Sequence, residues 1–356
     1  MRADYLWNAR ESLPRQIVLA PLCLIEAPYR LGAWAHRSVF RSGLRKRVRL
    51  DPCIVSIGNL CVGGSGKTPL AGWLASELRA RGRGVAILSR GVGGRRQHET
   101  SVVSDGERVL LGSADVGDEP VLLAGRARGV PVLAGRNRVA LGLRAAALFG
   151  PEILILDDGF QHHRLARDLD LVCLDARLGL GNRHVLPRGP LRESIGALRY
   201  ADAVVWTRIP PDAKTLPPLP AAAADKPEYG IEMVARGLRR VGAGGLAPVS
   251  SLRGQKIGLL AAIARPDRLR GELVALGAEI AVERFFADHH RYRRSDLASL
   301  DPGIPWVTTE KDAVKIPASW VASATLSVLE EEVRPWGTGH LIDLVLERVQ
   351  RRRAER

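Results

Sequence analysis

The residues best suited to chemistry lie in one glycine-rich run near the start of the chain. This run, Gly58 to Thr68, reads GNLCVGGSGKT; it follows an apolar segment and precedes an alanine- and leucine-rich one. Glycines leave backbone N–H groups free to face an anion, and the dipole of a following helix adds positive charge at the same place. Lys67 can then reach the β- and γ-phosphates of a nucleotide, and Thr68 can place its hydroxyl on Mg²⁺. The run therefore predicts a P-loop that binds ATP and Mg²⁺.

One position departs from the strict pattern GxxxxGK[ST], which requires glycine where this chain has Cys61. Gly63 and Gly64 can supply the missing flexibility. The alternative interpretation is a glycine-rich turn that contains GKT by chance. We expect the phosphates to be bound by Cys61, Val62, Gly63, Gly64, Ser65, Gly66, Lys67 and Thr68.

A pair of aspartates supports the nucleotide interpretation. The apolar run at 153–156 ends in Asp157 and Asp158, about 90 residues after Lys67. An aspartate at the end of a buried strand can hold Mg²⁺ directly or through water. Strands often end in acids, so the pair carries weight only beside the P-loop. Which of the two aspartates would bind the metal directly is left open.

The composition is that of a folded, basic protein. The 356 residues are 46% hydrophobic and 26% charged, and the formal net charge is +15. Only 7 of the 53 basic residues are lysine, so the basic surface is mostly arginine, whose planar fork suits phosphate and carboxylate. Nucleic acid or an anionic membrane would fit this charge, and genome base composition is the plain alternative. The four cysteines form no C-x-x-C pair, which argues against a zinc site and favours a reducing compartment.

The first 50 residues are expected to form a helix, a turn and a second helix. No stretch reaches the roughly 20 apolar residues of a spanning helix, and no signal peptide opens the chain. The longest uncharged stretch, residues 16–25, contains Pro21 and is flanked by Trp, Tyr and Arg residues. Such flanks favour the headgroup region of a bilayer. A helix packed on the core explains the same pattern equally well.

From Cys53 onward, apolar segments of strand type alternate with helical ones. We expect strands at 53–59, 85–91, 153–159, 169–176, 203–208, 256–264, 279–286 and 306–312, and helices at 69–81, 117–128, 136–149 and 266–276. Near-continuous apolar strands separated by helices favour a parallel sheet that is covered on both faces. Six prolines and a run of four alanines mark 209–228 as a linker.

The expected fold is therefore α/β, with a P-loop NTPase-like core, a mostly parallel sheet and a second, smaller α/β domain. The expected segments are an N-terminal helical membrane-interface segment (1–50), the P-loop core (51–208), the linker (209–228), the smaller α/β domain (229–335) and a C-terminal basic helix (336–356).

Two classes of P-loop protein are disfavoured. A GTPase reads guanine with an N/T-K-x-D motif, and the nearest match, TEKD at 309–312, has the wrong spacing. A helicase-type motor would need an arginine finger and nucleic-acid elements, which we do not find in the sequence.

Seven motifs in register carry a specific resemblance. They are GNLCVGGSGKTP (58–69), LSRG (88–91), GDEPVLLA (117–124), DDGFQH (157–162), LPRGPLRE (186–193), DHH (288–290) and TEKDAVK (309–315). In this order they resemble the tetraacyldisaccharide 4′-kinases, the lipid A kinases of Gram-negative bacteria, over residues 7–316. The resemblance implies transfer of the γ-phosphoryl group of ATP to the 4′-hydroxyl of a tetraacyl glucosamine disaccharide 1-phosphate.

The resemblance also implies a place in the cell and a set of partners. Such enzymes work at the cytoplasmic face of the inner membrane, with an N-terminal helix dipping into the bilayer and the active site between two domains. We therefore expect a glycolipid substrate and an anionic membrane surface as partners. We expect no nucleic acid and no obligate protein partner.

The resemblance assigns a catalytic pair. A sugar hydroxyl is a poor nucleophile, so the transfer needs a proton acceptor in line with the γ-phosphorus. Asp118 is our candidate base, and in the family this aspartate pairs with the histidine that matches His289. The pair would span the two expected domains, so closing the cleft would assemble it. The pattern alone would make Asp118 an acid at a helix N-terminus and His289 a surface histidine.

Further residues are candidates for the same site. Arg90 and Arg138 are expected as catalytic clamps on phosphate charge, although either could be a solvated surface arginine. Glu119 is expected to support the metal beside Thr68 and the two aspartates. Candidates for lining the pocket, or for the sugar and 1-phosphate of the acceptor, are Gln161, His162, Asn182 and Arg192. Departures from the family pattern, which concern the acceptor pocket, are Val92, Arg188, Ala262 and Ala264.

Two rival interpretations stay open. The net charge would fit a nucleic-acid-associated P-loop ATPase, whose hydrolysis would be stimulated by DNA or RNA. A non-catalytic membrane-bound nucleotide switch would bind ATP without turnover, and its function would survive Asp118→Ala.

Overall fold

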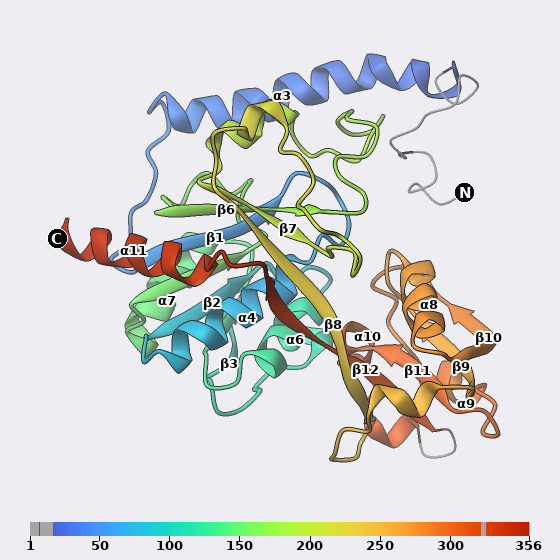
Figure 1. The fold of residues 1–356 in the computed structure, drawn as a ribbon. Helices are drawn as coiled ribbons and strands as arrows, with labels where there is room; N and C mark the ends of the chain where they lie inside the picture. The colour runs from blue at the N-terminus through green and yellow to red at the C-terminus, as the bar shows by residue number, and fades with distance from the viewer. Residues whose placement is uncertain (1–6, 8–16, 322–324, 356) are drawn as a thin grey trace.

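The computed structural model describes residue 7 and residues 17–321 and 325–355. Within these ranges the strands form a single 12-stranded sheet in the order β10-β9-β11-β12-β8-β7-β6-β1-β5-β2-β4-β3. Helices cover both faces of the half that runs from β7 to β3, and the strands β10, β9 and β11 at the other end belong to a smaller lobe (Figure 1). The expected α/β fold with a mostly parallel sheet is confirmed.

The core half is parallel except at its outer edge. Its strands are β1 (Cys53–Asn59), β2 (Val85–Ser89), β4 (Val132–Ala134), β5 (Ile153–Asp157), β6 (Leu169–Asp175) and β7 (Ala203–Thr207), with antiparallel β3 (Ser101–Ser104) at the edge. The central strand β1 pairs with β5 on one side and β6 on the other, so the residues that follow all three emerge at one edge of the sheet. The strands expected at 53–59, 85–91, 153–159, 169–176 and 203–208 are confirmed, most of them ending one or two residues earlier than expected.

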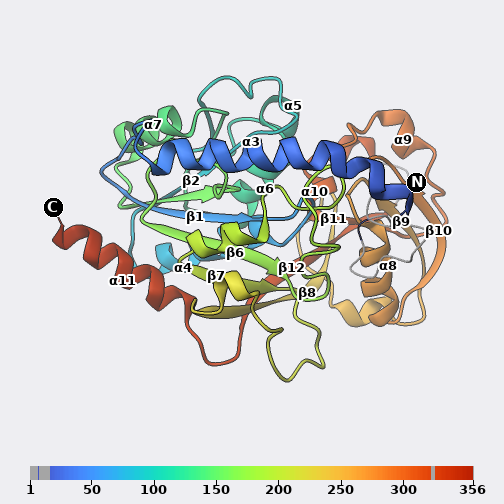
Figure 2. The ribbon, with the colours of Figure 1, turned by 90° about the horizontal axis from the view of Figure 1, so that it is seen from above.

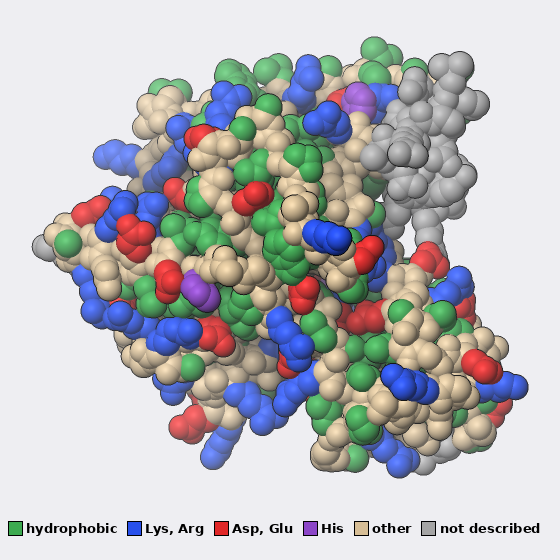
Figure 3. Space-filling view, in the orientation of Figure 1, with side chains coloured by type: hydrophobic (Ala, Val, Ile, Leu, Met, Phe, Trp, Pro, Cys, Tyr) green, Lys and Arg blue, Asp and Glu red, His purple; other side chains and the backbone are tan. Residues whose placement is uncertain are grey.

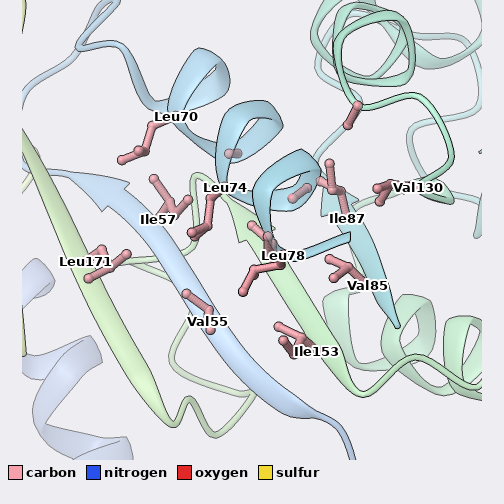
Figure 4. Close-up of a cluster of buried hydrophobic side chains, with 14 of the residues drawn as sticks. Val55, Ile57, Leu70, Leu74, Leu78, Val85, Ile87, Val130, Ile153 and Leu171 are labelled. Carbon is pink, nitrogen blue, oxygen red and sulfur yellow. The ribbon is translucent and has the colours of Figure 1, made fainter. Parts of the chain in front are cut away.

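Alternation along the central strands produces two separate apolar layers. Val55 and Ile57 face helix α4 (Lys67–Ala80), where Leu70, Leu74 and Leu78 of the helix pack onto them (Figure 4). The helices α6 (Asp118–Arg126) and α11 (Leu341–Ala354) cover the same face. Ile54 points the other way, toward helix α7 (Arg138–Phe149). Burial of both faces fixes the register of each strand, because a slip of one residue would exchange the two layers.

The smaller lobe continues the same sheet. Its strands are β9 (Lys256–Ala261), β10 (Glu279–Phe285) and β11 (Trp306–Thr309), and its helices are α8 (Pro266–Ala275), α9 (Arg294–Ala298) and α10 (Glu310–Ala313). Two long antiparallel strands, β8 (Glu228–Arg240) and β12 (Leu326–Trp336), connect the lobe to the core (Figure 1). Sequence reasoning did not predict these two strands. The division at residues 208, 228 and 335 stays a prediction.

The connecting segments are mostly packed rather than free. Residues of the expected linker, among them Ile209 and Ala223, pack on the core beside the short 3-10 helices η2 (Ile195–Tyr200) and η3 (Ala221–Ala223). The remaining short helices are α5 (Ser113–Val116), η4 (Val249–Leu252) and η5 (Ala318–Trp320).

A long N-terminal helix lies across the core. The 3-10 turn η1 (Ala20–Leu22) leads into α3 (Cys23–Arg41), which runs along one face of the molecule (Figures 1 and 2). Residues 17–41 are long and apolar enough to cross a membrane by length and composition. Sequence reasoning did not expect this, because the longest uncharged stretch, residues 16–25, is short and contains Pro21. Hydrophobic side chains lie along the upper edge of Figure 3, where α3 runs. The first of the two expected N-terminal helices falls largely on residues outside the described ranges.

Candidate active site

The glycine-rich run forms a loop between the end of β1 and the first turn of α4. Gly66 precedes the helix in a left-handed conformation with φ 77°, and a Cβ at this position would lie 3.2 Å from the Cβ of Thr207. Gly63 is also left-handed, with φ 97°. These conformations favour glycine and leave the backbone N–H groups of the loop unobstructed. The geometry is that of a P-loop, and the chance-turn interpretation does not account for it.

Hydrogen bonds to neighbouring strands hold the loop in shape. Asn59 Nδ2 donates to Ser65 Oγ over 2.8 Å, and Thr207 Oγ1 donates to the Ser65 carbonyl over 2.9 Å. The Val62 N–H donates to the Pro190 carbonyl over 2.8 Å, so the segment at 186–193 supports the loop from outside. Cys61 takes part in this packing, and burial raises the pKa of its thiol to about 11. Residues 63–68 line the main cleft, whereas Cys61 and Val62 line a smaller pocket behind the loop.

The first aspartate at the end of β5 lies deep beneath the P-loop. Asp157 is 1% exposed, and the hydroxyls of Thr68 and Ser89 both donate to its Oδ2 over 3.5 Å. Its other oxygen, Oδ1, is buried and has no hydrogen-bond partner among the described residues. Burial, together with the negative charges of Glu119 and Asp158, raises the pKa of Asp157 to about 7. A carboxylate in this state is short of positive charge, which a bound cation would supply.

The second aspartate has the opposite environment. Asp158 receives two contacts of 2.9 and 2.8 Å from Arg192 Nη1, and Lys67 Nζ lies 3.5 Å from its Oδ1. Burial would raise the pKa of Asp158, but the charges of Lys67 and Arg192 outweigh it and hold the pKa at about 2. Asp158 is therefore already neutralised by protein cations.

The predicted clamps differ in their access to the cleft. Arg90 is exposed and lines the cleft, and Glu119 lines it as well. Arg138 is buried, donates to the Gly135 carbonyl over 2.8 Å and does not line the cleft. Burial lowers the pKa of Arg138 to about 10, against the opposing field of Asp157. Arg138 therefore acts on Asp157 and Asp158 through its electrostatic field and not from within the cleft.

The pair expected from the resemblance is in contact. His289 Nδ1 lies 3.0 and 3.2 Å from the two carboxylate oxygens of Asp118, although 171 residues separate them. The carboxylate is 4% exposed, and the His289 ring lies over it at the cleft. The bond to Asp118 raises the pKa of His289 despite partial burial and the nearby charge of Lys311. Burial would raise the pKa of Asp118, but His289 and Lys311 lower it.

Lys311 completes this cluster. Its ammonium lies 3.0 Å from Asp288 Oδ1, 3.8 Å from Asp118 Oδ2 and 3.4 Å from His289 Nε2. Burial would lower the pKa of Lys311, but Asp118 and Asp288 raise it, so the residue stays charged. Since Lys311 faces Nε2 and Asp118 faces Nδ1, the neutral ring carries its hydrogen on Nδ1.

The P-loop and the Asp118–His289 pair share one cleft. It has a volume of about 420 Å³ and is lined by residues of the core and of the smaller lobe. Arg126 of α6 pairs with Glu310 of α10, which gives a second ionic link between the two halves. The size suits a nucleotide or a comparable ligand. A charged P-loop and a proton acceptor in one such cleft can position and deprotonate a hydroxyl beside a triphosphate.

Comparison with known proteins decides the family. The sequence profile of tetraacyldisaccharide-1-P 4′-kinase matches residues 16–350. A tetraacyldisaccharide 4′-kinase of Anaeromyxobacter sp. (strain Fw109-5) is 43% identical over 338 residues, which are 90% of this chain and 88% of that protein. One from Azoarcus sp. (strain BH72) is 40% identical over 353 residues, or 98% and 95% of the two chains. This chain belongs to the tetraacyldisaccharide 4′-kinase family.

The fold agrees with that of a solved family member. The crystal structure described as the "apo" form of LpxK from Aquifex aeolicus in complex with ATP is similar to this chain with a TM-score of 0.78 and 27% identity. The match covers 94% of this chain and 99% of the other. Family membership disfavours the nucleic-acid-associated ATPase that the net charge had left open.

Several residues of the kinase cleft were missed or placed differently by sequence reasoning. Lys311 was noticed only as part of the TEKDAVK motif, and no role was assigned to it. Asn182 donates from Nδ2 to the Arg188 carbonyl over 3.0 Å, and Gln161 donates to the Asn59 carbonyl over 3.0 Å. Neither lines the cleft, in contrast to Arg192. His162 is also outside its lining, and burial lowers the pKa of its ring to about 4.

Proposed function

We propose that this chain transfers the γ-phosphoryl group of ATP to the 4′-hydroxyl of a tetraacyl glucosamine disaccharide 1-phosphate, a reaction of lipid A biosynthesis. The observation that carries the proposal is the shared cleft, with the P-loop on one wall and His289, backed by Asp118, on the other. Family membership supports the substrate class, and the cleft supports the assignment of nucleotide and acceptor to one site.

The nucleotide end of the cleft is assigned to the P-loop. The N–H groups of residues 63–68 would face the phosphates, and Lys67, 3.5 Å from Asp158, could move to a phosphate oxygen. Thr68 and Asp157 would hold Mg²⁺, because their hydroxyl and carboxylate meet beneath the loop and Asp157 Oδ1 has no partner among the described residues. When bound, Mg²⁺ neutralises charge on the phosphate oxygens.

The metal is not enclosed by the protein alone. No group of three or more His, Cys, Asp or Glu side chains within the described ranges could hold a metal ion by itself. Thr68 and Asp157 would therefore supply only part of the ligand set, and water and nucleotide oxygens would supply the rest. Glu119 lines the cleft and raises the pKa of Asp157 through its charge, so it supports the same cation from a distance.

The acceptor end of the cleft is assigned to the pair of Asp118 and His289. The proton of the 4′-hydroxyl passes to this pair, which titrates as a unit because its members are in direct contact. His289 lines the cleft while Asp118 lies behind it, so the ring is the nearer group to an entering hydroxyl. Lys311 holds the ring from the other side.

The two predicted arginine clamps then have different tasks. Arg90 is exposed at the cleft and can contact a phosphate oxygen directly. Arg138 is buried and acts through its field on Asp157 and Asp158. We expect Arg90→Ala to weaken transition-state binding and Arg138→Met to disturb the aspartates themselves.

Label transfer from [γ-³²P]ATP to a detergent-solubilised tetraacyl disaccharide 1-phosphate tests the proposal. Wild type should label the lipid, and Lys67→Ala should abolish the labelling because the ammonium that follows the phosphate charge is gone. Lys256→Ala, which removes an exposed lysine at the start of β9, is the matched control and should keep full activity. Unlabelled lipid with wild type would refute the kinase assignment.

The membrane-bound switch makes a different prediction for the same assay. A switch would bind ATP without transferring phosphate, and its binding would be indifferent to the Asp118–His289 pair. Transfer that depends on Asp118 while ATP binding does not would therefore favour the kinase over the switch.

We further propose that α3 rests on an anionic membrane surface, at the cytoplasmic face of the inner membrane of a Gram-negative bacterium. Leu24, Leu31 and Trp34 are 81, 63 and 64% exposed, while Glu26 and Arg37 on the other side of the helix are buried against the core. A helix with one apolar and one docked face suits the interface better than the bilayer interior.

Co-sedimentation with vesicles of anionic phospholipid tests the membrane assignment. Leu24→Gln combined with Leu31→Gln should weaken binding, since about 1.5–3 kcal/mol is gained for each aliphatic side chain removed from water. The control is Val109→Gln combined with Leu110→Gln, two half-exposed residues in the segment that follows β3. Equal binding of both double variants would exclude α3 as the contact.

A further inference from the structure

A buried ion pair fastens α3 to the segment that carries Arg192. Arg37 Nε and Nη2 each lie 2.7 Å from a carboxylate oxygen of Glu193, and the two side chains are 6 and 7% exposed. Charges buried to this degree are costly unless they are paired with good geometry. An apolar pair would dock the helix at less cost, so the choice of a bidentate Arg–Glu pair calls for a reason beyond docking.

The Arg37 side chain contacts both sides of the pair formed by Arg192 and Asp158. Glu193 follows Arg192 directly in the chain. On the other side, the Arg37 guanidinium lies 4.5 Å from the ring centroid of Phe160, which is two residues beyond Asp158. One guanidinium therefore links Glu193, which is next to Arg192, with Phe160, which is two residues beyond Asp158.

The same region is tied to the P-loop and to α3 by further contacts. The hydroxyl of Tyr29, on α3, donates to the Arg192 carbonyl over 3.1 Å, and the Arg192 N–H donates to the Leu60 carbonyl over 2.7 Å. Phe160 packs so closely on Gly58 that a Cβ there would lie 2.4 Å from the Cβ of Phe160. Movement of α3 would therefore be transmitted to the backbone on either side of the loop.

We propose that Arg37 is a positioning residue for phosphoryl transfer, which sets the place of Arg192 and Asp158 beside Lys67 through Glu193 and Phe160. The inference rests on the proposed kinase function and adds to it a residue outside the cleft. Arg37 does not line the cleft, so it acts only through its neighbours. Through Arg37, the face of α3 that packs on the core contributes to the reaction.

The expected effect is on turnover more than on nucleotide binding. Loss of Arg37 lets Arg192 and Asp158 shift, and displacement of charged groups by about 1 Å costs roughly a hundredfold in rate when they act in the transition state. The backbone N–H groups of the P-loop remain, because Asn59 and Thr207 hold them independently. Arg37→Met should thus lower kcat by roughly tenfold to hundredfold and change the Kd for ATP by less than about threefold.

A double-mutant cycle tests whether Arg37 acts through Arg192. Label transfer is measured at saturating ATP for wild type, Arg37→Met, Arg192→Ala and the double variant. We expect the double variant to lose less than the product of the two single losses, since Arg192, one of the two groups that Arg37 positions, is then gone. Multiplication of the two losses would overturn the proposal, as would an unchanged kcat in Arg37→Met.

A matched variant of the same helix separates positioning from docking. Phe40 is also buried on α3, next to the rings of His36 and His163, and Phe40→Ala should lower Tm while kcat stays within about twofold of wild type. An equal fall of kcat in Phe40→Ala would reduce the role of Arg37 to docking and overturn the proposal. If Arg37→Met melts below the assay temperature, Glu193→Gln repeats the cycle with the shape of the side chain preserved.

The outcomes also separate this inference from the function on which it rests. Absence of label transfer in wild type would refute the kinase proposal. Normal transfer in wild type and in Arg37→Met would refute only the role of Arg37.

Discussion

Replacing Asp118 by asparagine tests the chemistry of the cleft with almost no change in shape. In wild type the carboxylate accepts from His289 Nδ1, and Lys311 faces Nε2 at 3.4 Å. Both neighbours favour the ring form with hydrogen on Nδ1, which leaves Nε2 able to accept a proton. The asparagine amide can donate to Nδ1, which favours the other form and turns the Nε2 hydrogen toward the Lys311 ammonium.

The size of the effect follows from this loss of proton acceptance. A positioned general base contributes about 10² to 10⁴ in rate, and each tenfold corresponds to about 1.36 kcal/mol of activation free energy. We therefore expect Asp118→Asn to lose about 2.7–5.4 kcal/mol of transition-state stabilisation. The effect should fall on kcat, because Asp118 does not line the cleft and the P-loop is untouched.

Two measurements on the same protein check this expectation. Label transfer from ATP to the tetraacyl disaccharide 1-phosphate gives kcat, and fluorescence titration with a labelled ATP analogue gives the affinity for nucleotide. His289→Gln is the companion variant, and a double variant no slower than either single one would show that the pair acts as a unit. The reasoning is refuted if Asp118→Asn keeps kcat within about threefold of wild type, or if its loss appears entirely as weaker ATP binding.

Three further predictions use the same apparatus. Asp157→Asn should abolish transfer yet raise Tm at pH 8 without Mg²⁺, because it removes a buried carboxylate that Glu119 and Asp158 repel. The pKa of His289 is raised in the folded protein, so its contact with Asp118 stabilises the fold fully below the unfolded-state pKa of about 6.5. This stabilisation is lost as the pH rises through the folded-state pKa. The Tm difference between wild type and His289→Gln should therefore be larger at pH 6 than at pH 9. Gly66→Ala should weaken ATP binding by about fivefold to thirtyfold, since a left-handed alanine costs about 1–2 kcal/mol, and calorimetric titration would show it.

The parts of the site that could be predicted from the sequence are those made by neighbours in the chain. The P-loop needs a strand, a glycine-rich turn and a helix in succession, and residues 53–80 supply all three. The aspartates at 157 and 158 were predictable for the same reason, since they end an apolar strand next to β1. The Asp118–His289 contact joins residues 171 apart and was predicted only through the family resemblance.

The parts that could not be predicted depend on distant contacts. Nothing near Arg192 in the sequence indicates that it binds Asp158, because the contact requires the 186–193 segment to lie against the P-loop. The strands β8 and β12 were missed because apolar and polar residues do not alternate regularly along them. Much of each strand is only half-buried and carries charged side chains such as Arg239 and Glu330, which pair with one another between the two strands. Yet this pair of strands connects the lobe that carries His289 to the core.

Asp157 and Asp158 are identical neighbours at the end of β5, and a change of backbone conformation between them gives them different tasks. Asp157 is the last residue of the strand and stays buried beneath the P-loop with only hydroxyl partners. Asp158 turns into the left-handed region with φ 56°, which aspartate tolerates better than most residues, and so reaches Lys67 and Arg192. The pKa of Asp157 stays raised despite the charges of Lys67 and Arg138, so a cation gains more from this carboxylate and Asp157 is the expected direct ligand of Mg²⁺. Asp158 then serves as the anion that keeps Lys67 and Arg192 extended toward the place of transfer.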